Sequence, residues 1–203
     1  QGHLGETLPA LREVYLGFTQ RSLWDITGNS SPFYDTSYMP ELFYQSQETA
    51  GETTAGGFRF LGYQAGYRHE SNGQAGLASR SLNILYVRPG VAFGRLDGWN
   101  LIVAPRLFDY VSDLTNNPDV RTYRGNAEVL IAMGRNDGPG LSVTIRPANK
   151  GSVQADLAFP LKSDRLFDFA TYFLIQYWNG YGESLRDYNV RSETLRVGVS
   201  LVR

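Results

Sequence analysis

The chain has 203 residues, with 19 Lys and Arg against 20 Asp and Glu, which gives a net charge of −1. This balance offers no basic field for phosphate contacts, so no nucleic-acid partner is expected. Cysteine is absent, which excludes disulfides and thiolate metal sites, and no run of 18 apolar residues predicts a transmembrane helix.

Ten segments rich in aromatic and β-branched residues are predicted to form strands. In chain order they are Leu11–Trp24, Tyr38–Gln47, Phe58–Glu70, Ser79–Phe93, Trp99–Val111, Arg121–Arg135, Leu141–Pro147, Gly151–Lys162, Phe167–Trp178 and the C-terminal stretch Leu195–Leu201. Several alternate cleanly between apolar and polar residues, as Val153 and Leu157 do against Gln154 and Asp156. A two-residue period gives each such strand one apolar and one polar face.

The connections between these segments differ in length. The turns "NDGPG" (136–140) and "ANKG" (148–151) are tight, whereas segments 112–120 and 179–193 are long and polar. We expect short turns at one rim and long loops at the other, as in an outer-membrane barrel. Strands of about ten residues also suit tilted crossing of a bilayer better than a soluble sheet. A soluble sandwich or lipocalin-like barrel, with the apolar face inside, is the alternative.

Three polar residues fall on the apolar face of two neighbouring segments. His69 and Ser71 lie two apart, so they share a face with Cα atoms about 6.6 Å apart. A hairpin centred near Gly76 would place Asn83 opposite His69, with Cβ atoms about 5 Å apart. Unpaired polar groups facing lipid are costly, so we expect these three side chains to pair with one another.

These three groups could perform nucleophilic catalysis. Ser71 needs a base to accept its proton, and His69 is within reach. The oxygen of Asn83 could fix the imidazole tautomer, as a carboxylate does in the familiar triad. The motif G-x-S-x-G is absent, which excludes an α/β-hydrolase elbow. The alternative is that a His-x-Ser pair on a strand is incidental.

The segment "HESNGQAGLASRSLN" (69–83) resembles the outer membrane phospholipase A family, with its His–acidic–Ser–Asn–Gly motif and its Ser–Arg–Ser–aromatic–Asn motif. Segments 19–43, 116–125 and 180–189 resemble the same family in the same order. Leu82 replaces the family's aromatic residue, Gln74 a familiar Arg, and Ile84 an Arg that commonly follows the asparagine. The resemblance implies an all-β, transmembrane antiparallel β-barrel of twelve strands. With ten predicted here, an N-terminal hairpin is expected to be missing from the single domain 1–203.

The resemblance also implies a catalytic set. Ser71 would be the nucleophile, His69 the general base and Asn83 the residue that orients it. The backbone amides of Ser71 and Gly73 would form the oxyanion hole. The implied activity is calcium-dependent hydrolysis of acyl esters in membrane glycerophospholipids, including A1, A2 and lysophospholipase activity, in the outer membrane of a Gram-negative bacterium.

A calcium ion and a second subunit are further implications of the resemblance. The Ca²⁺ ligands would be the Ser79 hydroxyl, the Gln74 carbonyl and the Ser30 hydroxyl of a partner in an active homodimer. Oxygen ligands of this kind suit calcium. Gln20 would form a hydrogen bond across the apolar dimer face. Two alternatives remain. One is a catalytically inert porin-like or structural barrel, and the other is a hydrolase of lipid A, which would require a carboxylate in place of Asn83 to orient the histidine.

Overall fold

The computed structural model describes residues 13–30, 32–46, 57–95, 98–111, 113–135, 138–161 and 171–201. Within these residues, ten strands form one antiparallel sheet in which each strand pairs with its neighbours along the chain. The strands are β1 (Val14–Trp24), β2 (Phe33–Gln45), β3 (Phe58–Ser71), β4 (Ser81–Gly94), β5 (Asn100–Tyr110), β6 (Ala127–Gly134), β7 (Gly140–Arg146), β8 (Ser152–Pro160), β9 (Tyr172–Gly180) and β10 (Ser192–Ser200). The all-β prediction, with its ten strands, is confirmed.

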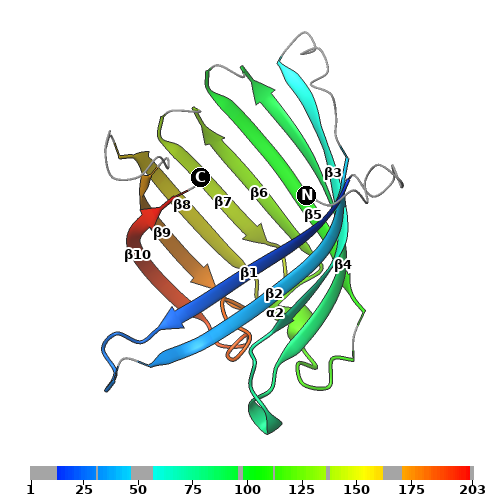
Figure 1. Cartoon of the computed structure of the whole chain (residues 1–203), viewed down its shortest axis with the longest axis vertical. Helices are drawn as coiled ribbons and strands as arrows, with labels where there is room; N and C mark the ends of the chain where they lie inside the picture. Colours follow the sequence, from blue (N-terminus) through cyan, green and yellow to red (C-terminus); the bar gives the residue numbers. More distant parts are fainter. Residues whose placement is uncertain are drawn as a thin grey trace, which may run out of the picture.

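The sheet curls around a central lumen, with β1 and β10 at its two edges (Figure 1). Within the described residues these two edge strands do not pair with each other, so the barrel is open between them. The expected N-terminal hairpin and the single domain stay predictions. No helix in the described ranges is long and apolar enough to cross a membrane.

The structure corrects the predicted strand Arg121–Arg135. Its first part is the short helix α2 (Val120–Arg124), and β6 begins only at Ala127. Val120 is fully buried, and Gly125, just after the helix, has a positive φ of 61°, which glycine adopts without steric cost. The alternating pattern of residues 121–125 is compatible with a strand. Packing of α2 in the lumen outweighs this local preference, and the segment is helical.

The predicted arrangement of loops also needs correction. Because the strands alternate in direction, the connections after the odd-numbered strands all lie at one rim, which we call the site rim. These connections are residues 25–32, 72–80, 111–126, 147–151 and 181–191. The tight turn 148–151 thus lies at the same rim as the two long loops, so the prediction of short turns at one rim and long loops at the other is wrong.

The two faces of the sheet differ in chemistry. Large apolar side chains are exposed on the outer face, including Leu16 at 87 % and Leu85 at 52 %. The lumen face carries ion pairs instead: Glu128 lies 2.9 Å from Arg106 and 3.0 Å from Arg146. A soluble sandwich would bury its apolar face, whereas an apolar exterior around a charged lumen is typical of a membrane barrel.

A small hydrophobic core fills the lumen near the site rim. It joins side chains of β4 and β5 to α2 and to the loop before β10, and its buried members are Leu82, Ile84, Tyr86, Tyr110, Val120, Leu185 and Tyr188. Helix α2 and this loop lie at the lower end of the barrel in Figure 1. The core holds the end of β4 against the loops, and β4 carries Asn83.

Candidate functional site

The hairpin of β3 and β4 has the register that the sequence predicts. His69 is paired with Asn83 and Ser71 with Ser81. The Nδ1 atom of His69 lies 2.7 Å from Oδ1 of Asn83. Because an asparagine oxygen only accepts, His69 donates from Nδ1, which leaves Nε2 as the acceptor that a general base requires.

A tyrosine joins this pair on the outer face. The hydroxyl of Tyr67 donates a 2.6 Å hydrogen bond to Oδ1 of Asn83. Ser71 lies on the same face, two residues beyond His69, but in the described structure its hydroxyl makes no hydrogen bond to the imidazole. Catalytic hydrogen bonds are often long without substrate, so this geometry is compatible with activation of the serine.

The residues between these side chains point the other way and are deeply buried. Glu70 separates His69 from Ser71 along β3, and its side chain is 2 % exposed. Leu82 and Ile84 flank Asn83 along β4 and belong to the lumen core. Each residue of the site therefore has a buried neighbour on the opposite face, which favours a fixed position of its backbone.

The loop between β3 and β4 is held in shape by Asn72, which is 3 % exposed. Its Nδ2 donates to the Ala78 carbonyl at 2.9 Å, and its Oδ1 accepts from the amides of Arg80 at 3.0 Å and Gln74 at 3.3 Å. Gly73 follows with a φ of 66°, and a Cβ at this position would lie 3.0 Å from the Tyr38 ring. This glycine turns the chain two residues after Ser71, the proposed nucleophile.

The predicted calcium ligands are compatible with the oxygens in this loop. Neither the Gln74 carbonyl nor the Ser79 hydroxyl is bonded to another described residue, so both remain available to a cation. Such neutral hard oxygens suit calcium, with water completing its coordination. Within the described ranges, no cluster of three or more His, Cys, Asp or Glu side chains could hold a metal ion.

Ser30 and Gln20 lie on the neighbouring hairpin of β1 and β2. Ser30 is exposed in the turn at the site rim, where it adopts a φ of 62°. This turn is stabilised by Asp25, whose pKa is lowered by hydrogen bonds from Thr27 and Gly28. Gln20 faces outward among apolar residues and donates a 3.3 Å hydrogen bond to Ser22. Both positions are accessible to a second subunit, but the roles proposed for them stay predictions.

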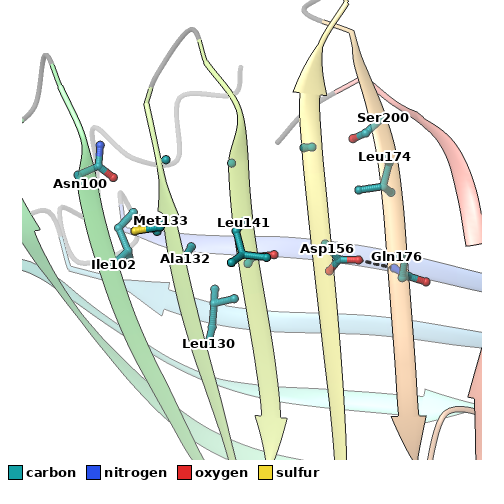
Figure 2. Close-up of a pocket in the computed structure, with 14 residues that line it drawn as sticks. Asn100, Ile102, Leu130, Ala132, Met133, Leu141, Asp156, Leu174, Gln176 and Ser200 are labelled. Atoms are coloured by element: carbon teal, nitrogen blue, oxygen red, sulfur yellow. Dashed lines mark hydrogen bonds between the residues drawn. The ribbon is translucent and has the colours of Figure 1, made fainter. Parts of the chain in front are cut away.

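Two hollows differ in their relation to this site. One, of about 530 Å³, lies near the opposite rim and contains Met133, Asp156 and Gln176 but none of the predicted site residues (Figure 2). The other, of about 410 Å³, is an open groove whose lining includes Tyr67 and Leu85. Most of its lining is apolar and faces outward, and Tyr67 in this lining lies two residues from His69.

The prediction from sequence missed three contributors: Tyr67, Glu70 and Asn72. Tyr67 shares the face of His69 and is two residues away, so the alternation alone could have drawn attention to it. Asn72 is part of the Asn–Gly pair that signals a turn. Glu70 had no local signal, because its partner Arg124 is 54 residues away in sequence.

The chain was compared with known proteins. The family model "Phospholipase A1" matches residues 4–201. A putative phospholipase A1 of Neisseria meningitidis is 34% identical over 92% of this chain and 48% of its own length. The phospholipase A1 of Escherichia coli is 33% identical over 91% of this chain and 60% of its own length. The chain thus spans about half to three-fifths of these relatives.

Solved structures show the same fold. Outer membrane phospholipase A from E. coli has 30% sequence identity and a TM-score of 0.78, over 93% of this chain and 70% of that one. A variant of it, with an asparagine replaced by alanine, is described as an active-site mutant. The Salmonella typhi outer membrane phospholipase has 28% identity and a TM-score of 0.77, over 93% of this chain and 71% of that one, and is described as a dimer with bound calcium.

Proposed function

Because this chain belongs to the phospholipase A1 family, we propose that it is the catalytic part of a calcium-dependent phospholipase. It hydrolyses acyl esters of glycerophospholipids, with A1, A2 and lysophospholipase activity, and it is active as a homodimer. The observation that carries this proposal is the hydrogen bond between His69 and Asn83 on the outward face of the hairpin. A catalytic histidine on a face that contacts hydrocarbon suits an enzyme that acts on membrane lipids and does not suit a soluble enzyme.

The chain lies in the outer membrane of a Gram-negative bacterium. Its outer face is apolar, and the site residues lie on that face close to the site rim. Phospholipids packed against the barrel would therefore reach the serine laterally, with the ester at the depth of the site and one acyl chain in the groove beside Tyr67. No cavity in the lumen is needed to hold the substrate.

In the proposed mechanism, Ser71 Oγ attacks the ester carbonyl while Nε2 of His69 takes its proton. Asn83 keeps the tautomer that leaves Nε2 free and accepts a hydrogen bond from the imidazolium that forms. His69 then protonates the departing alcohol. A water molecule, deprotonated by the same imidazole, hydrolyses the acyl-enzyme and regenerates Ser71.

The oxyanion formed in this reaction needs hydrogen-bond donors at the end of β3. The amides of Ser71 and Gly73 are proposed as these donors, and within the described structure the Gly73 amide makes no other hydrogen bond. Calcium, when bound by the Gln74 carbonyl and the Ser79 hydroxyl, would add positive charge beside the oxyanion. The turn built on Asn72 carries these groups and begins directly after Ser71, the last residue of β3.

Dimerisation is proposed to complete the site. Ser30 would contribute its hydroxyl to the calcium of the partner, and Gln20 would form a polar contact in the apolar interface. Gln20 pairs with Tyr38, and Tyr38 in turn pairs with Ser71, so the proposed interface adjoins the site. The relative described as a dimer with bound calcium supports the proposal that this chain also acts as a calcium-bound dimer.

The rival reading is an inert or porin-like barrel. The core of Tyr110, Val120 and Leu185 occupies the lumen near the site rim, which counts against an open channel. A structural barrel would also gain nothing from a histidine, an asparagine and a tyrosine bonded together on its lipid face, since buried polar groups there cost free energy.

Fatty-acid release from phosphatidylcholine in mixed micelles tests the proposal, measured with calcium and with chelator. We expect calcium-dependent release that is lost in Ser71→Ala and retained in Ser81→Ala, its partner across the hairpin. Release that survives Ser71→Ala or chelation would refute the mechanism. If the unsubstituted complete protein releases no fatty acid in any condition, the inert barrel is the better reading.

A further inference from the structure

We infer that Tyr67 is a positioning residue of the active site, which orients the Asn83 carboxamide so that its oxygen faces His69. This inference rests on the proposed function. It concerns a residue outside the proposed Ser71, His69 and Asn83 set, and it predicts a kinetic effect from removal of a single hydroxyl group.

The geometry places the tyrosine where it can act. Tyr67 is paired with Leu85 across the hairpin, so it lies diagonal to Asn83, at a separation that long side chains bridge. Its hydroxyl is 2.6 Å from Oδ1 of Asn83, the same atom that lies 2.7 Å from Nδ1 of His69. Two donors from β3 thus converge on one acceptor from β4.

An asparagine needs such help more than an aspartate does. The two ends of a carboxamide have nearly the same shape, but only the oxygen can accept a proton from His69. If the carboxamide turned over, its NH₂ group would face the Nδ1–H of the imidazole, and the Tyr67 hydroxyl proton would lose its acceptor. On a largely apolar outer face, the loss of that hydrogen bond costs free energy. The tyrosine therefore favours the productive orientation.

The chain supplies a matched control. Tyr63 lies on β3 with the same outward orientation and nearly the same exposure, 41 % against 40 % for Tyr67. Within the described residues its hydroxyl makes no hydrogen bond, and its ring packs near Tyr44. Replacing either tyrosine with phenylalanine removes one hydroxyl and keeps the ring. Only Tyr67→Phe also removes a hydrogen bond to Asn83, so the comparison of the two variants isolates the effect of that bond.

The kinetic test compares Tyr67→Phe with Tyr63→Phe in the complete protein with calcium, in phosphatidylcholine micelles. One hydrogen bond predicts about a three- to tenfold loss of kcat for Tyr67→Phe with KM unchanged, because the ring still lines the groove. Tyr63→Phe should keep full activity. In an Asn83→Ala background, Tyr67→Phe should cause no further loss, since the group that it orients is gone.

A spectroscopic measurement separates failure of this inference from failure of the proposed function. Nitrogen-15 chemical shifts of the His69 ring, identified by their loss in His69→Gln, report its tautomer without turnover. We expect the Nδ1–H form in the unsubstituted protein and in Tyr63→Phe, and a mixture of tautomers in Tyr67→Phe. Equal shifts in all three, or a Tyr67→Phe loss that multiplies with Asn83→Ala, would overturn the role of Tyr67. Absence of any turnover would refute the proposed function. The role of Tyr67 would then be tested by the nitrogen-15 shifts alone, which report the His69 tautomer.

Discussion

Glu70 and Arg124 form an ion pair inside the lumen, directly behind the site. Nη1 of Arg124 lies 2.9 Å from Oε2 of Glu70, and the two side chains are 6 % and 2 % exposed. Glu70 is the residue between His69 and Ser71, and Arg124 is the last residue of α2. The pair therefore ties the strand that carries two site residues to a helix in the lumen.

Glu70→Gln should destabilise the barrel by about 3–5 kcal/mol, because it leaves the Arg124 guanidinium buried without its counter-ion. The free energy of unfolding, measured by denaturant titration in detergent, tests this value. Asp109→Asn is the matched control. It breaks the Asp109–Arg121 pair, whose side chains are 69% and 45% exposed, and should cost about 1 kcal/mol or less. Equal losses in the two variants would contradict the role of burial.

Leu185 anchors the loop before β10 in the lumen core, where it is 0% exposed. Leu185→Ala should lower the free energy of unfolding by about 2–5 kcal/mol, through lost burial and the cavity that remains. Val190→Ala, in the same loop but at an exposed position, should change it by about 0.5 kcal/mol or less. If both variants unfold at the same denaturant concentration, the loop is not part of a cooperative core.

Sequence patterning predicted the strands and the central pairing of the site well. The two-residue period places His69, Ser71 and Asn83 on one face, and the short loop fixes the register that pairs His69 with Asn83. Both properties follow from backbone geometry over a few residues. The bonded pair of His69 and Asn83 could therefore be placed from the sequence. The sequence also predicted that Ser71 would pair with His69, but the described structure has no hydrogen bond between these two side chains.

The features that the sequence did not predict depend on distant packing. Helix α2 forms where local alternation suggests a strand, because Val120 packs into a core built from β4, β5 and another loop. The pairing of Glu70 with Arg124 joins segments that are 54 residues apart. The bond from Tyr67 to Asn83 depends on the reach of one side chain across a diagonal, which periodicity does not encode.

Tyr188 provides a prediction for alkaline pH. Burial, followed by a 2.5 Å hydrogen bond to Asp119, raises the pKa of this phenol from 10.0 to about 12. The folded state thus favours the neutral tyrosine. This contribution to stability is complete below the unfolded pKa of about 10 and is lost as the pH rises toward 12. In denaturant titrations across this range, Tyr188→Phe should show a shallower loss of stability than the unsubstituted protein. Parallel losses would contradict the assignment.

Asn72 should control calcium affinity more than it controls the fold. Its side chain donates one hydrogen bond and accepts two, and these set the path of residues 72–80, which carry the proposed ligands Gln74 and Ser79. Asn72→Ala should raise the calcium concentration needed for half-maximal fatty-acid release by about tenfold. Without these bonds, part of the free energy of calcium binding would be used to order the loop.

At saturating calcium, the Asn72→Ala variant should recover much of its activity, because Ser71 and His69 lie on β3 and outside the loop. Gln64→Ala on the same strand removes a side-chain hydrogen bond to Gln45, distant from the loop, and should leave the calcium dependence unchanged. If Asn72→Ala binds calcium as tightly as the unsubstituted protein, the ligands do not lie in this loop. If activity is lost at every calcium concentration while the fold persists, the turn instead positions the oxyanion donor at Gly73.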